Sequence, residues 1–238
     1  MTRFQMRMPR ETEMLKGWIA RYHFCSVVDI ACGTGLHAII LAQLGIQTVA
    51  ADISEAMLQN ARAHAEHFGV QIPWIQTSME HARQHIEGTY DAVFCLGNSL
   101  PHLLNQEALE AAVQNFARLL QPGGLAVIQI LNYQRILADQ QRIIGIHRQD
   151  DTEFIRFYDF LPDGIGFNLL TIQWEQGKPS HTLSTTLLYP YQQHEVVQAL
   201  STGGFRNFEY YGDMNFQPFD PQTSSNLVIV AQQPRPTD

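Results

Sequence analysis

The feature that most constrains the fold is an apolar run over residues 27–45 that is broken once by a glycine-containing turn. The run, VVDIACGTGLHAIILAQLG, predicts a buried strand, a turn at Gly33 and Gly35, and a helix that Gly45 ends. Glycine lets the backbone pass close to a ligand because it has no Cβ, and the amides of the following helix point at that ligand. The stretch therefore predicts a nucleotide-like cofactor at the carboxyl end of the first strand.

A second strand, over residues 47–51, ends one helix and one strand further on at Asp52. This spacing places Asp52 at the carboxyl edge of the neighbouring parallel strand, where a carboxylate can accept both hydroxyls of a ribose. Ser54 then caps a helix over residues 55–68. We expect Asp52 to bind a ribose, and a solvated aspartate at the strand end is the structural alternative.

The residues before the turn sharpen this prediction. Asp29 lies inside the first strand and gives the pattern Asp29-x-Ala31-x-Gly33-x-Gly35. This pattern resembles the first motif of the class I S-adenosylmethionine-dependent methyltransferases, and AADISEAMLQNAR, residues 50–62, resembles their second motif. The resemblance implies that Asp52 holds the ribose and that Ile53 and Met57 flank the adenine, although helix-to-sheet packing would also account for a methionine at this place.

The resemblance also implies a full set of cofactor contacts. After a third strand over residues 72–76, the family commonly has an aspartate that meets the adenine amino group, and this chain has Ser78 there. A serine brings no charge, and Glu80 could replace the missing carboxylate only if the loop were shifted. The implied cofactor site consists of Asp29, Ala31, Cys32, Gly33, Gly35, His37, Asp52, Ile53, Met57, Ser78, Met79, Leu96 and Gly97.

The predicted acceptor side follows the fourth strand, over residues 90–96. The stretch CLGNSLPHL, residues 95–103, resembles the loop of small-molecule N-methyltransferases related to glycine and sarcosine methylation. The resemblance places Asn98 toward the substrate. His102 has a catalytic and a structural interpretation, because neutral imidazoles often serve as packed partners. The candidate acceptor-positioning residues are Asn98, His102 and Tyr133, and His102 or Tyr133 could take a proton from the acceptor.

The residue at position 131 bears on the identity of the methyl acceptor. The glycine-methylating relatives have an arginine directly before an Asn-Tyr pair, where it holds the substrate carboxylate. This chain keeps Asn132-Tyr133 but has Leu131 at the arginine position. An alkyl chain cannot replace a bidentate guanidinium, so glycine is not the expected acceptor unless Arg135 or Arg156 supplies the charge. The aromatic residues of a later insert favour a larger or less polar acceptor.

The order of elements predicts an α/β fold. A helix over residues 9–24 precedes five strands that alternate with helices, which indicates a Rossmann-like, doubly wound, mostly parallel sheet. Residues 205–211 and 227–231 resemble the antiparallel hairpin that completes seven strands in these enzymes, after a helix over residues 189–203. We expect one domain, residues 1–238, with an inserted antiparallel β lid at 138–189. Residues 4–10 are a second candidate for a cofactor lid.

Composition limits the class of partner. The net charge is −8 with no basic run, which argues against a nucleic-acid substrate. The three cysteines, Cys25, Cys32 and Cys95, include no Cys-x-x-Cys pair and indicate buried thiols in a reducing compartment, not a metal site. No apolar segment approaches membrane-spanning length. The expectation is a cytoplasmic protein that acts on a small molecule without a membrane or metal, and the sequence leaves its oligomeric state open.

Two other functions stay open at this point. The pattern Gly33-x-Gly35-x-x-Ala38 also fits the loose dinucleotide motif, so the glycines alone do not separate a methyl donor from NAD. Asp29 and the closing hairpin argue against a nicotinamide-dependent oxidoreductase. A protein that binds S-adenosylmethionine or its product S-adenosylhomocysteine without turnover remains the alternative to a methyltransferase, because a fold does not establish an activity.

Overall fold

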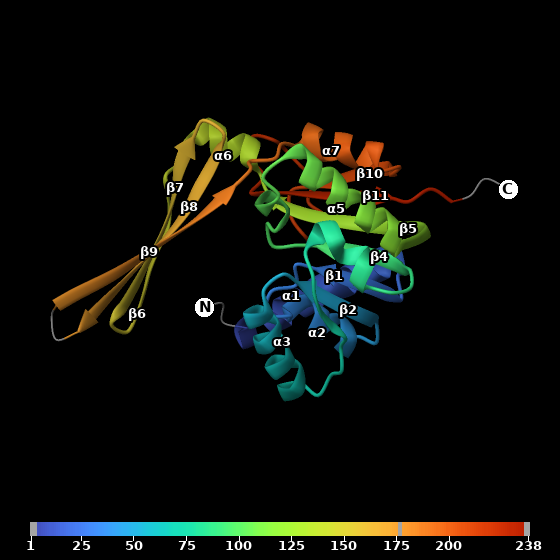
Figure 1. Ribbon diagram of the computed structural model, residues 1–238, viewed down its shortest axis with the longest axis horizontal. Helices are drawn as coiled ribbons and strands as arrows, with labels where there is room; N and C mark the ends of the chain where they lie inside the picture. Colours follow the sequence, from blue (N-terminus) through green and yellow to red (C-terminus); the bar gives the residue numbers. More distant parts are fainter. Residues whose placement is uncertain (1–3, 176–177, 236–238) are drawn as a thin grey trace.

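A computed structural model describes residues 4–175 and 178–235 (Figure 1). Its centre is a seven-stranded sheet with the strand order β10-β11-β5-β4-β1-β2-β3. β1 pairs in parallel with β2 and β4, and β11 runs antiparallel to β5 and β10. This topology confirms the predicted doubly wound sheet with a closing hairpin. The strands are β1 (Ser26–Ile30), β2 (Gln47–Asp52), β3 (Trp74–Gln76), β4 (Tyr90–Cys95), β5 (Leu120–Leu131), β10 (Arg206–Tyr211) and β11 (Asn226–Gln232).

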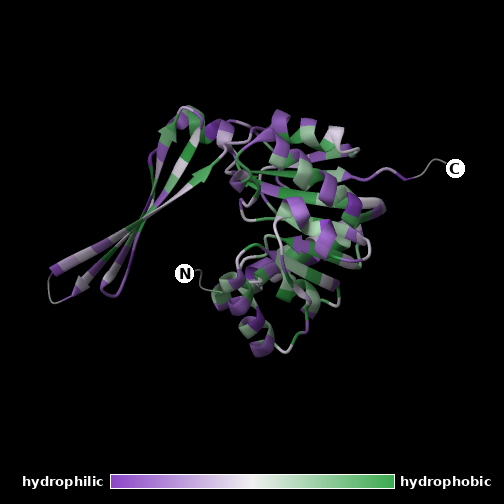
Figure 2. Ribbon diagram, in the orientation of Figure 1, coloured by the Kyte–Doolittle hydropathy of each residue, from purple (hydrophilic) through white to green (hydrophobic). Residues whose placement is uncertain are grey.

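Helices cover both faces of this sheet, which is why its strands are continuous apolar runs. Adjacent residues of β1 show the two layers: Val27 packs with α1 and α2, whereas Val28 packs with α5 and α7, and both are fully buried. Figure 2 shows hydrophobic residues concentrated on the central strands. The helices are α1 (Phe4–Tyr22), α2 (Leu36–Gln43) and α3 (Glu55–His67) on one face, and α4 (Ala82–His85), α5 (Gln106–Leu119) and α7 (Gln193–Thr202) on the other.

A second sheet of four antiparallel strands leaves the body after the short helix α6 (Tyr133–Asp139). We call this sheet the arm. It extends from the body as a twisted ribbon (Figure 1). Its register places Phe154, Arg156 and Tyr158 on one face and Ile155 and Phe157 on the other, as their alternation predicts. The arm consists of β6 (Ile143–Gln149), β7 (Thr152–Leu161), β8 (Gly164–Glu175) and β9 (Lys178–Leu188).

Several element boundaries differ from the prediction. β6 was not predicted, because the run IIGIHRQ has no polar alternation and Gly145 interrupts it. The first helix begins at Phe4 and continues through Pro9, since the buried Phe4 ring packs on His64 and Phe68 and extends the helix by more than a turn. β5 begins at Leu120, whereas the apolar run predicts a strand only over residues 125–131. The last helix begins at Gln193 and not at residue 189.

Asp91 joins the starts of two central strands. Its Oδ2 accepts hydrogen bonds from the Cys25 N–H at 2.7 Å, the Ser26 N–H at 2.8 Å and the Ser26 Oγ at 3.0 Å. The Ser26 hydroxyl in turn accepts a bond from the Asp91 N–H at 2.9 Å. These bonds to a charged acceptor fix the register of β1 and β4 at the edge opposite the glycine turn.

We expect Asp91→Ala to lower the free energy of unfolding by about 2–4 kcal/mol, because two backbone N–H groups lose a charged acceptor. Urea denaturation followed by circular dichroism measures this. The matched control is Asp163→Ala, at an exposed turn of the arm. A loss in Asp91→Ala no larger than in the control would contradict the proposed clamp.

Candidate functional site

The glycine turn between β1 and α2 holds three residues in the left-handed region. Ala31, Gly33 and Gly35 have φ angles of 57°, 55° and 82°. A Cβ on Gly33 would meet no atom within 4 Å, whereas a Cβ on Gly35 would lie 2.6 Å from the Trp74 ring. Gly33 therefore faces open space that a ligand can use, and Gly35 is required by packing against β3. The Cys32 N–H donates to the Ala51 carbonyl at 3.0 Å and fixes the turn to β2.

Asp52 lies at the end of β2, as predicted, and it binds the turn directly. Its Oδ2 accepts from the Gly33 N–H at 2.8 Å, and its Oδ1 accepts from the Ser54 N–H at 2.9 Å. The residue is 8% exposed. Each carboxylate oxygen can accept more than one hydrogen bond, so Asp52 can hold the turn and still accept the hydroxyls of a ribose.

Asp29 is buried in β1 beneath the turn. Burial raises its pKa to about 6, and the nearby His37 and the Ala38 N–H act in the opposite direction. His37 Nε2 lies 3.3 Å from Glu11 Oε2, and this bond is the main cause that lowers the pKa of Glu11 to about 2. A carboxylate on α1 thus connects the first helix to the N-terminus of α2, next to Asp29.

A cavity of about 120 Å³ lies beside the turn, at the carboxyl ends of β1, β2 and β3. Ile53 and Met57 are 69% and 43% exposed, so helix-to-sheet packing does not account for their apolar side chains. Glu80, which was expected to reach the site only if the loop were shifted, lines the same cavity as Ser78. The lining residues are Ala31, Ile53, Thr77, Ser78, Met79, Glu80, His102 and Leu103.

His102 therefore lies on the wall of this cavity, on the short helix Leu100–His102. Burial lowers the pKa of His102, with a smaller opposing effect from Asp52. Its imidazole is neutral at pH 7 and can accept a proton or a hydrogen bond. Leu96, just after β4, is 4% exposed and packs beneath the loop.

Asn98 and Tyr133 are brought together at the ends of β4 and β5. Gly97 and Asn98 are both left-handed, with φ angles of 72° and 66°. The Asn98 Nδ2 donates to the Tyr133 hydroxyl at 2.9 Å, and its Oδ1 accepts from the Leu131 N–H at 2.9 Å. Burial raises the pKa of Tyr133, so its phenol stays protonated at neutral pH and orients a partner without acting as a base.

A second cavity, of about 230 Å³, lies between α6, the end of β5 and the root of the arm. Leu131 lines it, and so does Arg135, whose Nη1 donates to the Thr223 carbonyl at 2.9 Å and whose Nε lies 3.7 Å from Asp139. Arg156 is exposed on the arm and does not line it. The lining residues are Leu131, Arg135, Ile136, Asp139, Gln141, Ile144, Tyr158 and Ser225.

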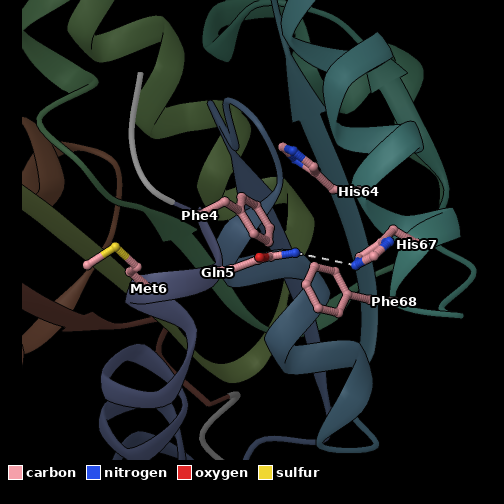
Figure 3. A pocket seen from close by; sticks show the side chains of 6 residues that line it. All are labelled: Phe4, Gln5, Met6, His64, His67 and Phe68. Atoms are coloured by element: carbon pink, nitrogen blue, oxygen red, sulfur yellow. Dashed lines mark hydrogen bonds between the residues drawn. The ribbon is translucent and has the colours of Figure 1, made fainter. Parts of the chain in front are cut away.

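The start of α1 lies against α3, as Figure 3 shows. The Phe4 ring lies 4.1 Å from the His64 ring, and His64 Nδ1 lies 3.1 Å from the Thr34 carbonyl in the glycine turn. Gln5 Nε2 lies 3.5 Å from His67 Nε2. The first residues of α1 therefore contact the helix that bears Met57, close to the turn. That residues 4–10 form a cofactor lid stays a prediction.

Among residues 4–175 and 178–235, no helix is long and apolar enough to cross a membrane. The same residues hold no group of three or more His, Cys, Asp or Glu side chains placed to bind a metal ion. Cys25, Cys32 and Cys95 are all free thiols, but the prediction that they are buried is right only for Cys95. Cys32 is half-buried in the glycine turn, and Cys25 is exposed because it lies just before β1.

Comparisons with known proteins point to a methyltransferase. The model of a methyltransferase domain matches residues 27–124, which begin at β1 and include both cofactor motifs. The chain is 26% identical over 201 residues to a glycine/sarcosine N-methyltransferase from Halorhodospira halochloris, covering 82% of this chain and 71% of that protein. It is 35% identical over 144 residues to human glycine N-methyltransferase, covering 53% of this chain and about half, 49%, of that protein.

Two solved structures share the fold. An S-adenosylmethionine-dependent methyltransferase from Clostridium acetobutylicum superposes with a TM-score of 0.84 at 14% identity, over 95% of this chain and 92% of that one. The sugar N-methyltransferase KedS8 from Streptoalloteichus superposes with a TM-score of 0.72 at 19% identity, over 98% and 89%. Together with Asp29, the glycine turn and Asp52, the domain match and the N-methyltransferase relatives support a class I S-adenosylmethionine-dependent methyltransferase.

Proposed function

We propose that the protein transfers the methyl group of S-adenosylmethionine to the nitrogen of a small molecule larger than glycine. The observation that carries this proposal is the bonded pair Asn98–Tyr133, in which Asn98 also accepts from the N–H of Leu131, a residue that lines the second cavity. Among the relatives, a glycine/sarcosine N-methyltransferase and a sugar N-methyltransferase both act on small molecules by their names. Leu131 and the cavity volume of about 230 Å³ favour an acceptor larger than glycine.

The residues present fit the methyl donor. Open space at Gly33 lets the donor approach the backbone, and Asp52 has free lone pairs for two ribose hydroxyls. Ile53 supplies an apolar cover for an adenine ring, and Glu80 or Ser78 can accept a hydrogen bond from its amino group. When bound, S-adenosylmethionine supplies a reactive methyl group on a positively charged sulfur.

The protein's own contribution is mainly positioning. Asn98 is held by Leu131 and Tyr133, so it can orient an acceptor without losing rotamer freedom at each turnover. An amine that arrives protonated must lose a proton, and the neutral imidazole of His102 is a group that can receive it.

The test of the function uses methyl-labelled S-adenosylmethionine with a cell extract and then with a panel of amines that contains glycine, sarcosine and amino sugars. We expect label in the small-molecule fraction and faster methylation of the larger amines. Label in RNA, DNA or bulk protein would refute the proposal, and so would glycine as the best acceptor. Binding of the donor with no turnover of any amine would favour a non-enzymatic binding protein.

Asp52→Asn should weaken binding of S-adenosylhomocysteine by about 10- to 100-fold, because it removes the charge from bonds worth about 1.5–3 kcal/mol each. Isothermal titration calorimetry measures the dissociation constant, with Asp163→Asn as the control. NAD should not bind to either protein. Unchanged affinity in Asp52→Asn would show that the ribose lies elsewhere.

We expect the buried Asp29 carboxylate to lower the free energy of unfolding at neutral pH, although the residue contributes to cofactor binding. Its pKa of about 6 in the folded chain lies above the ordinary 3.8, so the free energy of unfolding falls as the pH rises from about 4 to 6. Asp29→Asn has no such loss. We expect the substitution to gain about 1–3 kcal/mol relative to wild type between pH 4 and pH 7.5 in urea denaturation, while S-adenosylmethionine binds more weakly. If the difference in the free energy of unfolding between the variant and the wild type does not depend on pH, the pKa of Asp29 is not raised in the folded chain.

Tyr133→Phe should lower kcat about tenfold and leave the affinity for S-adenosylhomocysteine within twofold, as expected for a group that positions the acceptor. Tyr189→Phe is the matched control, because the Tyr189 hydroxyl bonds Glu195 on α7. Initial rates and calorimetry give the two quantities. If Tyr133→Phe loses donor affinity as much as rate, Tyr133 supports the cofactor and not the acceptor.

A further inference from the structure

One polar residue interrupts an otherwise apolar strand. Gln129 lies in the run LAVIQIL, residues 125–131, on β5 between β4 and β11. It shares a face of the sheet with Val127, two residues before it, and with Val228, its register partner, and both valines are fully buried. A polar side chain on such a face costs free energy unless its polar atoms are bonded. The partners of the Gln129 amide therefore explain the residue better than the packing of the sheet does.

Both polar atoms of this half-buried amide are bonded. Its Oε1 accepts from the Gly97 N–H at 3.0 Å, and its Nε2 donates to the Asn226 Oδ1 at 3.2 Å. The orientation of the amide follows from chemistry, because a main-chain N–H only donates and so must face the oxygen. The main-chain carbonyl of Gln129 also accepts from the Asn98 N–H at 3.1 Å. One residue thus binds both main-chain N–H groups of the turn after β4.

This turn has a backbone that needs support. Gly97 and Asn98 are consecutive left-handed residues, with φ angles of 72° and 66°. Asparagine tolerates this region better than most residues, but such a conformation persists only where surrounding contacts hold it. A Cβ on Gly97 would meet no atom within 4 Å, so packing does not hold the turn on that side. The hydrogen bonds to Gln129 supply the support.

The second partner of the amide borders the acceptor side. Asn226 begins β11 opposite Leu131, and the residue before it, Ser225, lines the cavity of about 230 Å³. The Ser225 carbonyl accepts from the Asn132 N–H at 3.1 Å. The Gln129 amide therefore joins the turn after β4 to the strand end that borders this cavity.

We propose that Gln129 is a positioning residue of the methyl transfer, which fixes the Gly97–Asn98 turn against β11 so that Asn98 presents one geometry to the acceptor. The inference rests on the proposed function, since it takes Asn98 as the group that orients the acceptor. Gln129 lines neither the cavity at His102 nor the cavity at Leu131, so it acts through the turn. A misplacement of about 1 Å can cost a hundredfold in rate, which makes such support a kinetic quantity.

The first test is the kinetics of two variants with the amine that the wild type methylates fastest. Gln129→Met keeps the length of the side chain and loses both hydrogen bonds. We expect kcat to fall about tenfold and the dissociation constant of S-adenosylhomocysteine to stay within about threefold. Gln129→Glu keeps an oxygen for the Gly97 N–H, and Asn226 can turn its amide to donate to the new carboxylate. This variant should keep kcat within about threefold of the wild type.

Gln232→Met is the matched control. Gln232 lies on β11 and is half-buried like Gln129, but it lies at the opposite edge of the sheet. Its amide is also bonded at both atoms, with the Asn207 Nδ2 at 2.9 Å and the Gly123 carbonyl at 3.2 Å. The control thus removes the same kind of bonds away from the turn, and we expect it to leave kcat unchanged.

The second test needs no acceptor. Hydrogen exchange of the Gly97 amide, followed by NMR, should be about tenfold faster in Gln129→Met, because an amide exchanges when its hydrogen bond is open. Exchange in Gln129→Glu and Gln232→Met should match the wild type. If circular dichroism shows that Gln129→Met is not folded, Asn226→Ala removes the other anchor of the amide and should give faster Gly97 exchange and a kcat about threefold lower.

Unchanged Gly97 exchange in Gln129→Met would overturn the inference, whether or not an amine is methylated. Equal losses of kcat in Gln129→Met and Gln129→Glu would also overturn it, as would a loss of donor affinity as large as the loss of rate. A wild type that methylates no amine would instead refute the proposed function, and the exchange measurement would still decide whether Gln129 holds the turn.

Discussion

The site depends on the bond between the Asp52 carboxylate and the Gly33 N–H. This bond joins the end of β2 to the turn after β1, and the same side chain accepts from the Ser54 N–H at the start of α3. One carboxylate thus fixes the three segments that would surround a nucleoside. A side chain at Gly33 would project into the space that these segments leave open, and its φ of 55° would strain any residue other than glycine.

Much of the fold could be predicted because its strands are buried on both faces. Val27 and Val28 point into different layers and are both apolar, so the sequence shows the uninterrupted apolar run that is typical of a doubly covered strand. β6 gave no such signal, since every one of its residues is exposed and its place in the sheet depends on pairing with β7. Pairing between strands leaves no periodicity in a strand that buries neither face.

The candidate site was predictable in its motif residues and less so around them. The spacing from Gly35 to Asp52 gives the position of two strand ends, but it could not show that Gly35 is small because of Trp74. Glu80 lines the cavity from a 3₁₀ turn, Met79–His81, that follows β3, and the residue spacing does not predict this turn. The partnership of Glu11 with His37 joins residues 26 positions apart, which no local pattern reports.

The arm and the acceptor side of the site share one set of contacts. Tyr158, from β7, is buried beside Tyr133, and both the arm root and α6 line the cavity that contains Leu131. Any shift of the arm would therefore move the Tyr133 hydroxyl, and with it Asn98, whose side chain bonds that hydroxyl.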